Sequence, residues 1–121
     1  MPRYGKQKPR IDIFQDGFID LAERGLELIR HYGIELLPWQ ELVLRRWLAT
    51  DKNDCWANNN CGLVVPRQNG KSELLIARII IGMIFRGEHI VFTAQSVETA
   101  NTIKRRVFRF YFEAESEIRD L

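Results

Sequence analysis

The sequence predicts an α/β fold, in which parallel strands are flanked by helices and preceded by two further helices. Two short apolar runs, residues 61–66 and 89–94, have the length and valine content of buried strands. Longer stretches with helical periodicity precede, separate and follow these runs. Strands that alternate with helices form parallel sheets with right-handed crossovers, which is the arrangement we expect here.

The composition is that of one folded, soluble domain. Of the 121 residues, 45% are hydrophobic and 28% are charged, which excludes disorder along the whole chain. The net charge of +2 is too small to indicate nucleic acid as a partner by itself. The longest apolar run, residues 74–85, is too short to cross a bilayer. Cys55 and Cys61 match no common metal or redox spacing, and we expect two free thiols in a reducing cytoplasm.

The first third of the chain predicts a flexible arm and two helices. Residues 1–15 are predicted to be a flexible basic arm, because lysine and arginine are mixed with proline and glycine there. A helical pattern begins at Asp16 and closes at Gly33, and Pro38 begins a second helix that ends near Thr50. The apolar positions of the first helix are Phe18, Leu21, Ala22, Leu26 and Ile29. One face of the second carries Trp39, Leu42, Val43, Arg46 and Trp47.

The remaining elements follow the same logic. Residues 51–60 are rich in Asp, Asn and Lys and predict a loop. Residues 71–86 are apolar on nearly all sides and predict a buried helix that Gly87 ends. Ser96 is a predicted cap for a long helix from Val97 to about Arg119. Its predicted buried stripe is Val97, Ala100, Ile103, Val107, Tyr111, Ala114 and Ile118.

Residues 65–72, Val-Pro-Arg-Gln-Asn-Gly-Lys-Ser, resemble a phosphate-binding loop. That pattern requires glycine, four free positions, and then Gly-Lys followed by Ser or Thr. Gly70, Lys71 and Ser72 match, while Val65 replaces the first glycine. Gly70 lets the backbone approach phosphate oxygens closely.

A chance match is the alternative, because Asn69-Gly70 is also a strong hairpin-turn dipeptide. A hairpin requires a strand on its far side. Residues 73–85 are long, lack alternation and are rich in Leu, Ile and Ala, which favours a helix. A strand before the loop and a helix after it are the context of a nucleotide site.

The residue types suit a triphosphate and its metal, so we expect ATP and Mg²⁺ as cofactors. Helix N-termini offer unpaired N–H donors and a favourable dipole to anions. Pro66 has no N–H, so the donors begin at about Gln68 and continue through Asn69. Lys71 is predicted to reach the β- and γ-phosphates, and the Ser72 hydroxyl is predicted to hold Mg²⁺.

The loop closely resembles the modified Walker A motif of large terminase subunits from tailed phages, the ATP-driven motors that package DNA into procapsids. The resemblance implies a P-loop NTPase fold of the RecA-like (ASCE) type. It also implies catalytic roles for Arg67, acting in cis on the γ-phosphate, and for Lys71. Residues 37–40, Leu-Pro-Trp-Gln, resemble the adenine-recognition segment of these motors, which implies that Gln40 contacts adenine. The alternative places Gln40 on the wet side of its helix, with Trp39 in the core.

Two further segments leave alternatives open. Residues 89–96 resemble the second conserved strand of these motors, which ends in Thr-Ala near the DNA track, and a plain strand-to-helix connection is the alternative. The basic residues of the last helix, Arg105, Arg106 and Arg109, are followed by acidic residues. A solvated, salt-bridged face is therefore the preferred interpretation for them.

The sequence resembles only part of such a motor. The Walker B segment, its catalytic glutamate and the acidic cluster of the nuclease domain have no counterpart here. Residues 16–121 are therefore expected to be the N-terminal portion of a P-loop ATPase domain, as a fragment, a split gene product or one piece of an assembly. Whether the chain itself is an enzyme stays open, and we expect weak ATP binding with negligible hydrolysis.

The partners implied by the resemblance are double-stranded DNA, a portal protein, a small terminase subunit and further copies of the chain in a ring. The implied location is the host cytoplasm, with transient attachment to the procapsid. Two alternatives are a helicase-like, nucleic-acid-dependent ATPase and a truncated, non-catalytic remnant or interaction module. A small-molecule kinase is disfavoured by the two helices before the loop and by the Pro-Trp-Gln segment.

Overall fold

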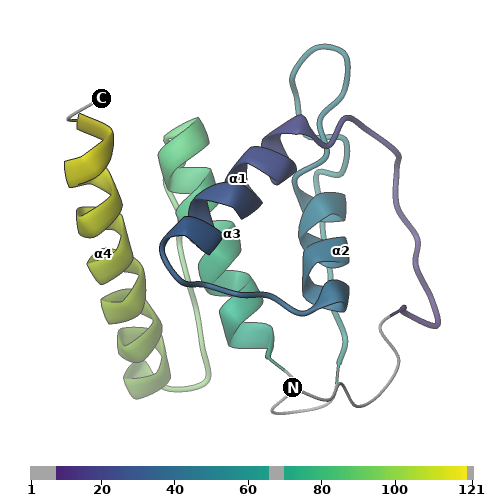
Figure 1. Cartoon of the computed structure of the whole chain (residues 1–121). Coiled ribbons are helices and arrows are strands. Elements are labelled where there is room, and N and C mark those ends of the chain that lie inside the picture. Colours follow the sequence, from purple (N-terminus) through teal and green to yellow (C-terminus); the bar gives the residue numbers. More distant parts are fainter. Residues whose placement is uncertain (1–7, 66–69, 120–121) are drawn as a thin grey trace.

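The computed structural model describes residues 8–65 and 70–119, and its regular elements are four helices (Figure 1). They are α1 (Asp20–His31), α2 (Pro38–Trp47), α3 (Lys71–Arg86) and α4 (Val97–Arg119). Helix α3 is the centre of the fold, because α1, α2 and α4 all pack against it. None of the described helices is long and apolar enough to cross a membrane.

The prediction of an α/β fold is wrong, because the described ranges contain no sheet. Residues 61–65 and 89–94, the described parts of the two predicted strands, form no strand. Within the described residues, β pairing is limited to two isolated antiparallel bridges, Phe18 with Thr50 and Thr50 with Trp56. The described chain is therefore all-helical, and these residues do not form the parallel strands of a P-loop NTPase.

The two apolar runs fail as strands because neither has a partner. A strand exists only through hydrogen bonds to a neighbouring strand. Across the part of the chain that the structure covers, neither run takes part in a backbone–backbone hydrogen bond. Figure 1 shows the first run behind α2 and the second on the side of α3 that faces α4, so they do not pair with each other. Their middle residues, Val64 and Val91, are 99% and 91% exposed.

Helix α1 begins four residues later than predicted. The Phe18 N–H donates to the Thr50 carbonyl over 2.8 Å, and the Thr50 N–H donates to the Phe18 carbonyl over 3.1 Å. These two bonds hold residue 18 outside the helix. Its side chain is 58% exposed instead of buried. The predicted end is confirmed, because the helix stops at His31 and Gly33, with φ +89°, follows its C-cap residue Tyr32. The residues that α1 buries are Leu21, Ala22, Gly25, Leu26 and Ile29.

Helix α3 follows its predicted bounds, from Lys71 to Arg86. Gly87, with φ +59°, ends it in the left-handed conformation that favours glycine. Its buried residues face all three other helices, which is why the segment is apolar on nearly all sides. The closest approach is to α1 at Gly25, where an added Cβ would lie 2.7–2.9 Å from the side-chain atoms of Ile81.

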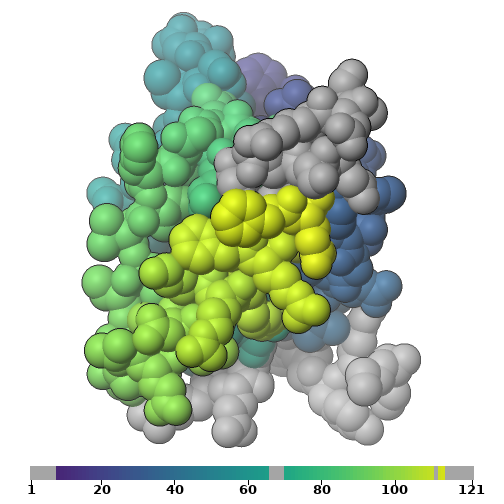
Figure 2. All heavy atoms as spheres, turned by 90° about the vertical axis from the view of Figure 1, so that its left-hand side faces the viewer, coloured from purple at the N-terminus to yellow at the C-terminus, as the bar shows by residue number. Residues whose placement is uncertain are grey.

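Helix α4 lies across one face of the molecule (Figure 2). The predicted cap is confirmed, since the Ser96 hydroxyl oxygen accepts the Thr99 N–H over 3.2 Å. The buried stripe consists of Ile103, Val107 and Phe110 among the side chains described. Val97 was predicted to belong to it but, as the first residue of α4, is 78% exposed. The side chains of Tyr111, Ala114 and Ile118 lie outside the described ones.

Residues 8–15 belong to the segment predicted as a flexible arm, and they contact α2 and the loop after it. An Asp12 carboxylate oxygen lies 3.3 Å from an Arg46 nitrogen, and the same guanidinium stacks on the Phe14 ring with 3.4 Å between its carbon and the ring centroid. Asn58 accepts the Gln15 N–H over 2.8 Å and donates to the Gln15 carbonyl over 3.0 Å. The basic composition of this segment gave no sign of these contacts.

Candidate phosphate site at the start of α3

The first turn of α3 begins at the residue that the motif predicts. Gly70 is the N-cap and has φ +89° and ψ 22°, a left-handed conformation that suits glycine. No side chain caps this helix, and no described group accepts the N–H of Lys71, Ser72 or Glu73. Within the described residues these three amides are therefore free donors, at the positive end of the helix dipole.

The side chains of Lys71 and Ser72 are exposed and have no hydrogen bond or ion pair with the described chain. A lysine ammonium without a carboxylate partner is available to an anion. A serine hydroxyl in the same state can donate to an oxygen or serve as a ligand of a hard cation. Both predicted residues are thus placed next to the free amides.

Glu73 also lies in this turn, and its negative charge is balanced. Both of its carboxylate oxygens accept from the guanidinium of Arg106 on α4, and the longer contact is 3.0 Å. The hydrogen bond to Glu73 raises the pKa of Arg106. Because this pair neutralises the carboxylate, the start of α3 keeps the positive potential of its amides and of Lys71.

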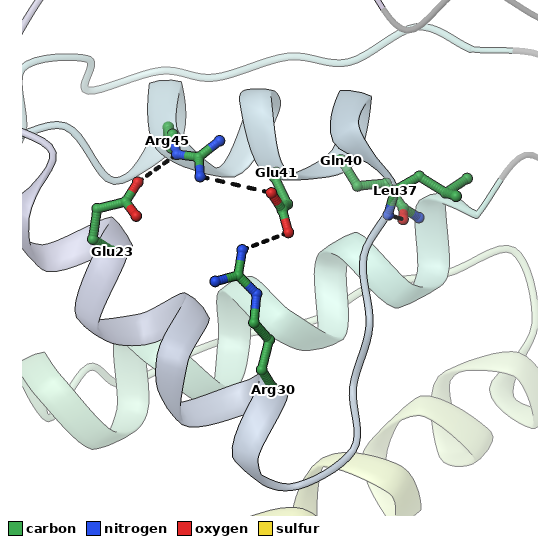
Figure 3. A network of polar contacts seen from close by, with 6 residues as sticks. All are labelled: Glu23, Arg30, Leu37, Gln40, Glu41 and Arg45. Carbon is green, nitrogen blue, oxygen red and sulfur yellow. Dashed lines mark hydrogen bonds and ion pairs between the residues drawn. The ribbon is translucent and has the colours of Figure 1, made fainter. Parts of the chain in front are cut away.

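Gln40 is buried, with 4% of its surface exposed, so the alternative that placed it on the wet side of its helix is wrong. Its side-chain oxygen accepts the N–H of Leu37 over 2.7 Å, as Figure 3 shows. Its side-chain nitrogen donates to the carbonyl oxygen of Gly70 over 2.8 Å. Trp39 is partly buried against the core, as the core interpretation predicts. A contact between Gln40 and adenine stays a prediction.

An open hollow of about 1120 Å³ adjoins the start of α3. Gly70 and Glu73 contribute to its wall, together with Trp39 and Gln40 from α2. Residues 8–14 and residues 60–65 also line it. Ligand pockets for small molecules typically have volumes of about 300–1,000 Å³, so the hollow has room for a nucleotide.

The structure brings together only part of the predicted site. Gln40 and Gly70 are in contact, and Lys71 and Ser72 follow directly. Arg67, Gln68 and Asn69 lie outside the described residues, as does Pro66. Their predicted roles at the phosphates therefore stay predictions.

The polar residues before α4 form a plain connection to that helix, which is the second of the two interpretations given for residues 89–96. The described chain gives Thr93 and Gln95 no hydrogen bond, and both are exposed, whereas Ser96 caps the helix. On α4, Arg106 pairs with Glu73, and Arg109 lies 3.9 Å from Glu113. These ion pairs agree with the salt-bridged face preferred from the sequence.

Other candidate chemistry in the described ranges is limited. Cys55 and Cys61 are free, as predicted, and both residues are exposed. Desolvation by the surrounding chain raises the pKa of the Cys61 thiol, and the charge of Arg78 opposes this effect. No group of three or more His, Cys, Asp or Glu side chains is arranged to hold a metal ion among the residues described.

Sequence reasoning missed the contact between Gln40 and Gly70, which are 30 positions apart. One local signal existed, because a glutamine three residues after a helix N-cap commonly accepts the N-cap N–H. That signal predicts the bond to Leu37 but not the bond to Gly70, which depends on how α2 packs against α3. Asn58, which holds residue 15, gave no signal beyond its place in a polar loop.

A comparison with protein-family models, with curated proteins and with solved structures found no match to this chain. The assignment of function therefore depends on the residues themselves.

Proposed function

We propose that the first turn of α3 binds the terminal phosphates of ATP, and that this chain is the ATP-binding portion of a DNA-packaging motor similar to a phage large terminase. One observation carries the proposal: an uncapped helix N-terminus at Gly70 coincides with the Gly-Lys-Ser of the motif. The tripeptide lies at the start of a 16-residue helix whose first three amides have no acceptor in the described chain, which is where donors to a phosphate are needed. The proposal does not include a P-loop NTPase fold, because the described residues form no sheet.

The phosphates are bound by donors that are already in place. The N–H groups of Lys71, Ser72 and Glu73 converge at the start of α3, where the helix dipole favours negative charge. The Lys71 ammonium adds a charge-assisted hydrogen bond to a phosphate oxygen. The left-handed Gly70 lets the chain turn into the helix without a side chain beside the anion.

The Ser72 hydroxyl would hold Mg²⁺ together with phosphate oxygens, and the ion would neutralise part of the phosphate charge. This hydroxyl fits the role because the described chain gives it no other partner. Arg67 is proposed to stabilise the γ-phosphate, by resemblance to the packaging motors. The proposed partners are double-stranded DNA, a portal protein and a small terminase subunit, also by resemblance.

Titration of the purified chain with Mg·ATP, followed by calorimetry, tests the proposal. We expect saturable binding that weakens by about tenfold or more in Lys71→Ala, because that change removes the only charged group of the proposed phosphate contacts that the structure describes. Lys52→Ala is the matched control, since Lys52 is exposed in the loop after α2, and it should bind like the wild type. Absence of saturable binding, or equal binding by the Lys71 variant, would refute the proposal.

The same samples separate the competing functions. A non-catalytic remnant need not bind nucleotide at all, whereas a helicase-like ATPase binds it and is stimulated by single-stranded nucleic acid. The chain alone is expected to hydrolyse ATP negligibly, because it contains no counterpart of the Walker B glutamate. Turnover near one per second, lost in Lys71→Ala, would contradict that expectation.

A further inference from the structure

We infer that Gln40 is a positioning residue, which sets the direction of the Lys71 amide through Gly70 and does not contact the base. The inference rests on the proposed phosphate site and assigns one of its parts. It differs from the role that the resemblance implies, in which the glutamine recognises adenine.

The side chain of Gln40 is already occupied at both ends. Its oxygen accepts the Leu37 N–H over 2.7 Å, and its nitrogen donates to the Gly70 carbonyl oxygen over 2.8 Å. Only 4% of the residue is exposed. Turning this amide toward a base would leave the Leu37 N–H without its partner. It would also leave the Gly70 carbonyl with only the longer bond from the Leu74 N–H, over 3.4 Å, and losing such bonds is unfavourable for buried polar groups.

The bond to Gly70 fixes a peptide group of the proposed site. The Gly70 carbonyl and the Lys71 N–H belong to one planar, trans peptide unit, so they point in opposite directions. Because Gln40 holds the carbonyl on the side of α2, the Lys71 N–H is directed away from α2. That N–H is one of the free donors of the first turn of α3.

Gly70 is matched to this arrangement in two ways. Its φ of +89° is a conformation that L side chains rarely adopt. In addition, a Cβ at this position would lie 2.5 Å from the side-chain nitrogen of Gln40 and 3.9 Å from the Trp39 ring. The glycine is therefore required for the left-handed turn and also for the approach of the amide.

The two roles of Gln40 predict different selectivity. A residue that recognises adenine affects the binding of ATP but not of GTP or of tripolyphosphate, which has no base. A residue that positions the Lys71 amide affects all three ligands by the same factor, because the phosphate contact is common to them.

The test measures the affinity of the wild type, Gln40→Ala and Gln40→Glu for Mg·ATP, Mg·GTP and Mg·tripolyphosphate. Gln40→Glu keeps the acceptor for Leu37 but places a carboxylate against the Gly70 carbonyl. We expect each variant to lose about tenfold in affinity, equally for the three ligands. Gln95→Ala, a change at an exposed glutamine without a hydrogen bond in the described chain, is the control and should lose nothing. Loss for ATP alone, or no loss, would overturn the inference.

A measurement on the wild type avoids any folding defect of the variants. The side-chain amide resonances of Gln40 should shift by the same amount with ATP, GTP and tripolyphosphate, and a shift specific to ATP would overturn the inference. If the wild type binds none of the ligands, the proposed function itself fails. A changed ¹H–¹⁵N residual dipolar coupling of the Lys71 amide, relative to the other amides of α3, in a folded Gln40→Ala variant then shows positioning by Gln40, and an unchanged coupling refutes it.

Discussion

The side-chain nitrogen of Gln40 and the carbonyl oxygen of Gly70 lie 2.8 Å apart, which ties the first turn of α2 to the residue that begins α3. The same side chain accepts the N–H of Leu37, the N-cap of α2. One buried amide therefore connects the starts of two helices. A proposed anion site at the second start is held in place by the packing of the first.

At Gly25, where α1 contacts α3, we expect Gly→Ala to destabilise the fold, although the same change stabilises most helices. In a free helix interior, Gly→Ala stabilises by about 1 kcal/mol. At Gly25 the added Cβ would lie within 2.9 Å of three Ile81 atoms, so overpacking, which typically destabilises by about 1–3 kcal/mol, outweighs that gain. We expect Gly25→Ala to lower the free energy of unfolding by about 1 kcal/mol in a urea titration.

The matched background for this substitution is Ile81→Ala, which removes the atoms that the Cβ would meet. In that background Gly25→Ala should become neutral or stabilising by up to about 1 kcal/mol, because only the helix propensity remains. An equal effect of Gly25→Ala in both backgrounds would show that the two helices are not in contact at this position.

A chain of ion pairs joins α1 to α2 through Glu41 (Figure 3). Its carboxylate contacts Arg30 over 2.7 Å and Arg45 over 3.6 Å, and Arg45 also pairs with Glu23. The hydrogen bond to Glu41 raises the pKa of Arg30. Because the partners are partly exposed, we expect Glu41→Gln to destabilise by only about 0.5–1 kcal/mol.

Urea titrations at low and high salt check this prediction, since the loss should shrink as salt screens the pairs. Glu35→Gln is the control, because Glu35 is exposed and has no ion pair within the described chain. A loss that is large and independent of salt would mean that Glu41 acts through packing instead of charge.

The exposed valines of the two unpaired runs predict a small effect on stability. Val64→Thr and Val91→Thr should change the free energy of unfolding by less than about 0.5 kcal/mol, because both side chains are already in solvent. Leu44→Ala, at a fully buried position of α2, should lower it by about 2–5 kcal/mol. Destabilisation above about 1 kcal/mol by either threonine would contradict the absence of strand pairing.

The thiol of Cys61 predicts a pH dependence. Desolvation raises its pKa in the folded chain, so the thiolate, which is the form that reacts, appears at higher pH than in the unfolded chain. In a Cys55→Ser background, the rate of alkylation should rise with a midpoint above that of the same chain in urea. A midpoint equal to or below the unfolded value would contradict this.

The same shift affects stability, and its sign follows from the raised pKa. The folded state holds the thiol proton more tightly than the unfolded state does. The folded state therefore keeps its full free energy of unfolding below the unfolded pKa of the thiol. Part of this free energy is lost as the pH rises through the folded pKa, because the thiolate is the less favourable form in the folded chain. The effect is confined to the alkaline side of neutrality.

The helices that begin or end at a local signal could be predicted from the sequence. Pro38 begins α2, Gly87 ends α3, and Ser96 caps α4, each through bonds or dihedrals confined to a few neighbouring residues. The strands could not, because residues 61–65 and 89–94 have strand composition but no partner to pair with in the described chain. Local preference cannot supply a pairing between distant segments.

In the candidate site, too, the features set by neighbouring residues could be predicted, and those set by helix packing could not. The motif predicted where α3 starts and which residues, Lys71 and Ser72, stand beside its free amides. The environment of Gln40 was not predictable, because its burial and its bond to Gly70 arise from the packing of α2 on α3. The contact of Phe14 with Arg46 likewise depends on how residues 8–15 cross α2.

A titration of the ¹⁵N-labelled chain with Mg·ATP, followed amide by amide, tests directly whether the first turn of α3 binds phosphate. We expect saturable shifts that are largest at Gly70, Lys71, Ser72 and Glu73 and that require about tenfold or more nucleotide in Lys71→Ala, while Lys52→Ala leaves them unchanged. Saturable shifts elsewhere with these four amides unmoved, or no saturable shift up to about 10 mM nucleotide, would contradict it.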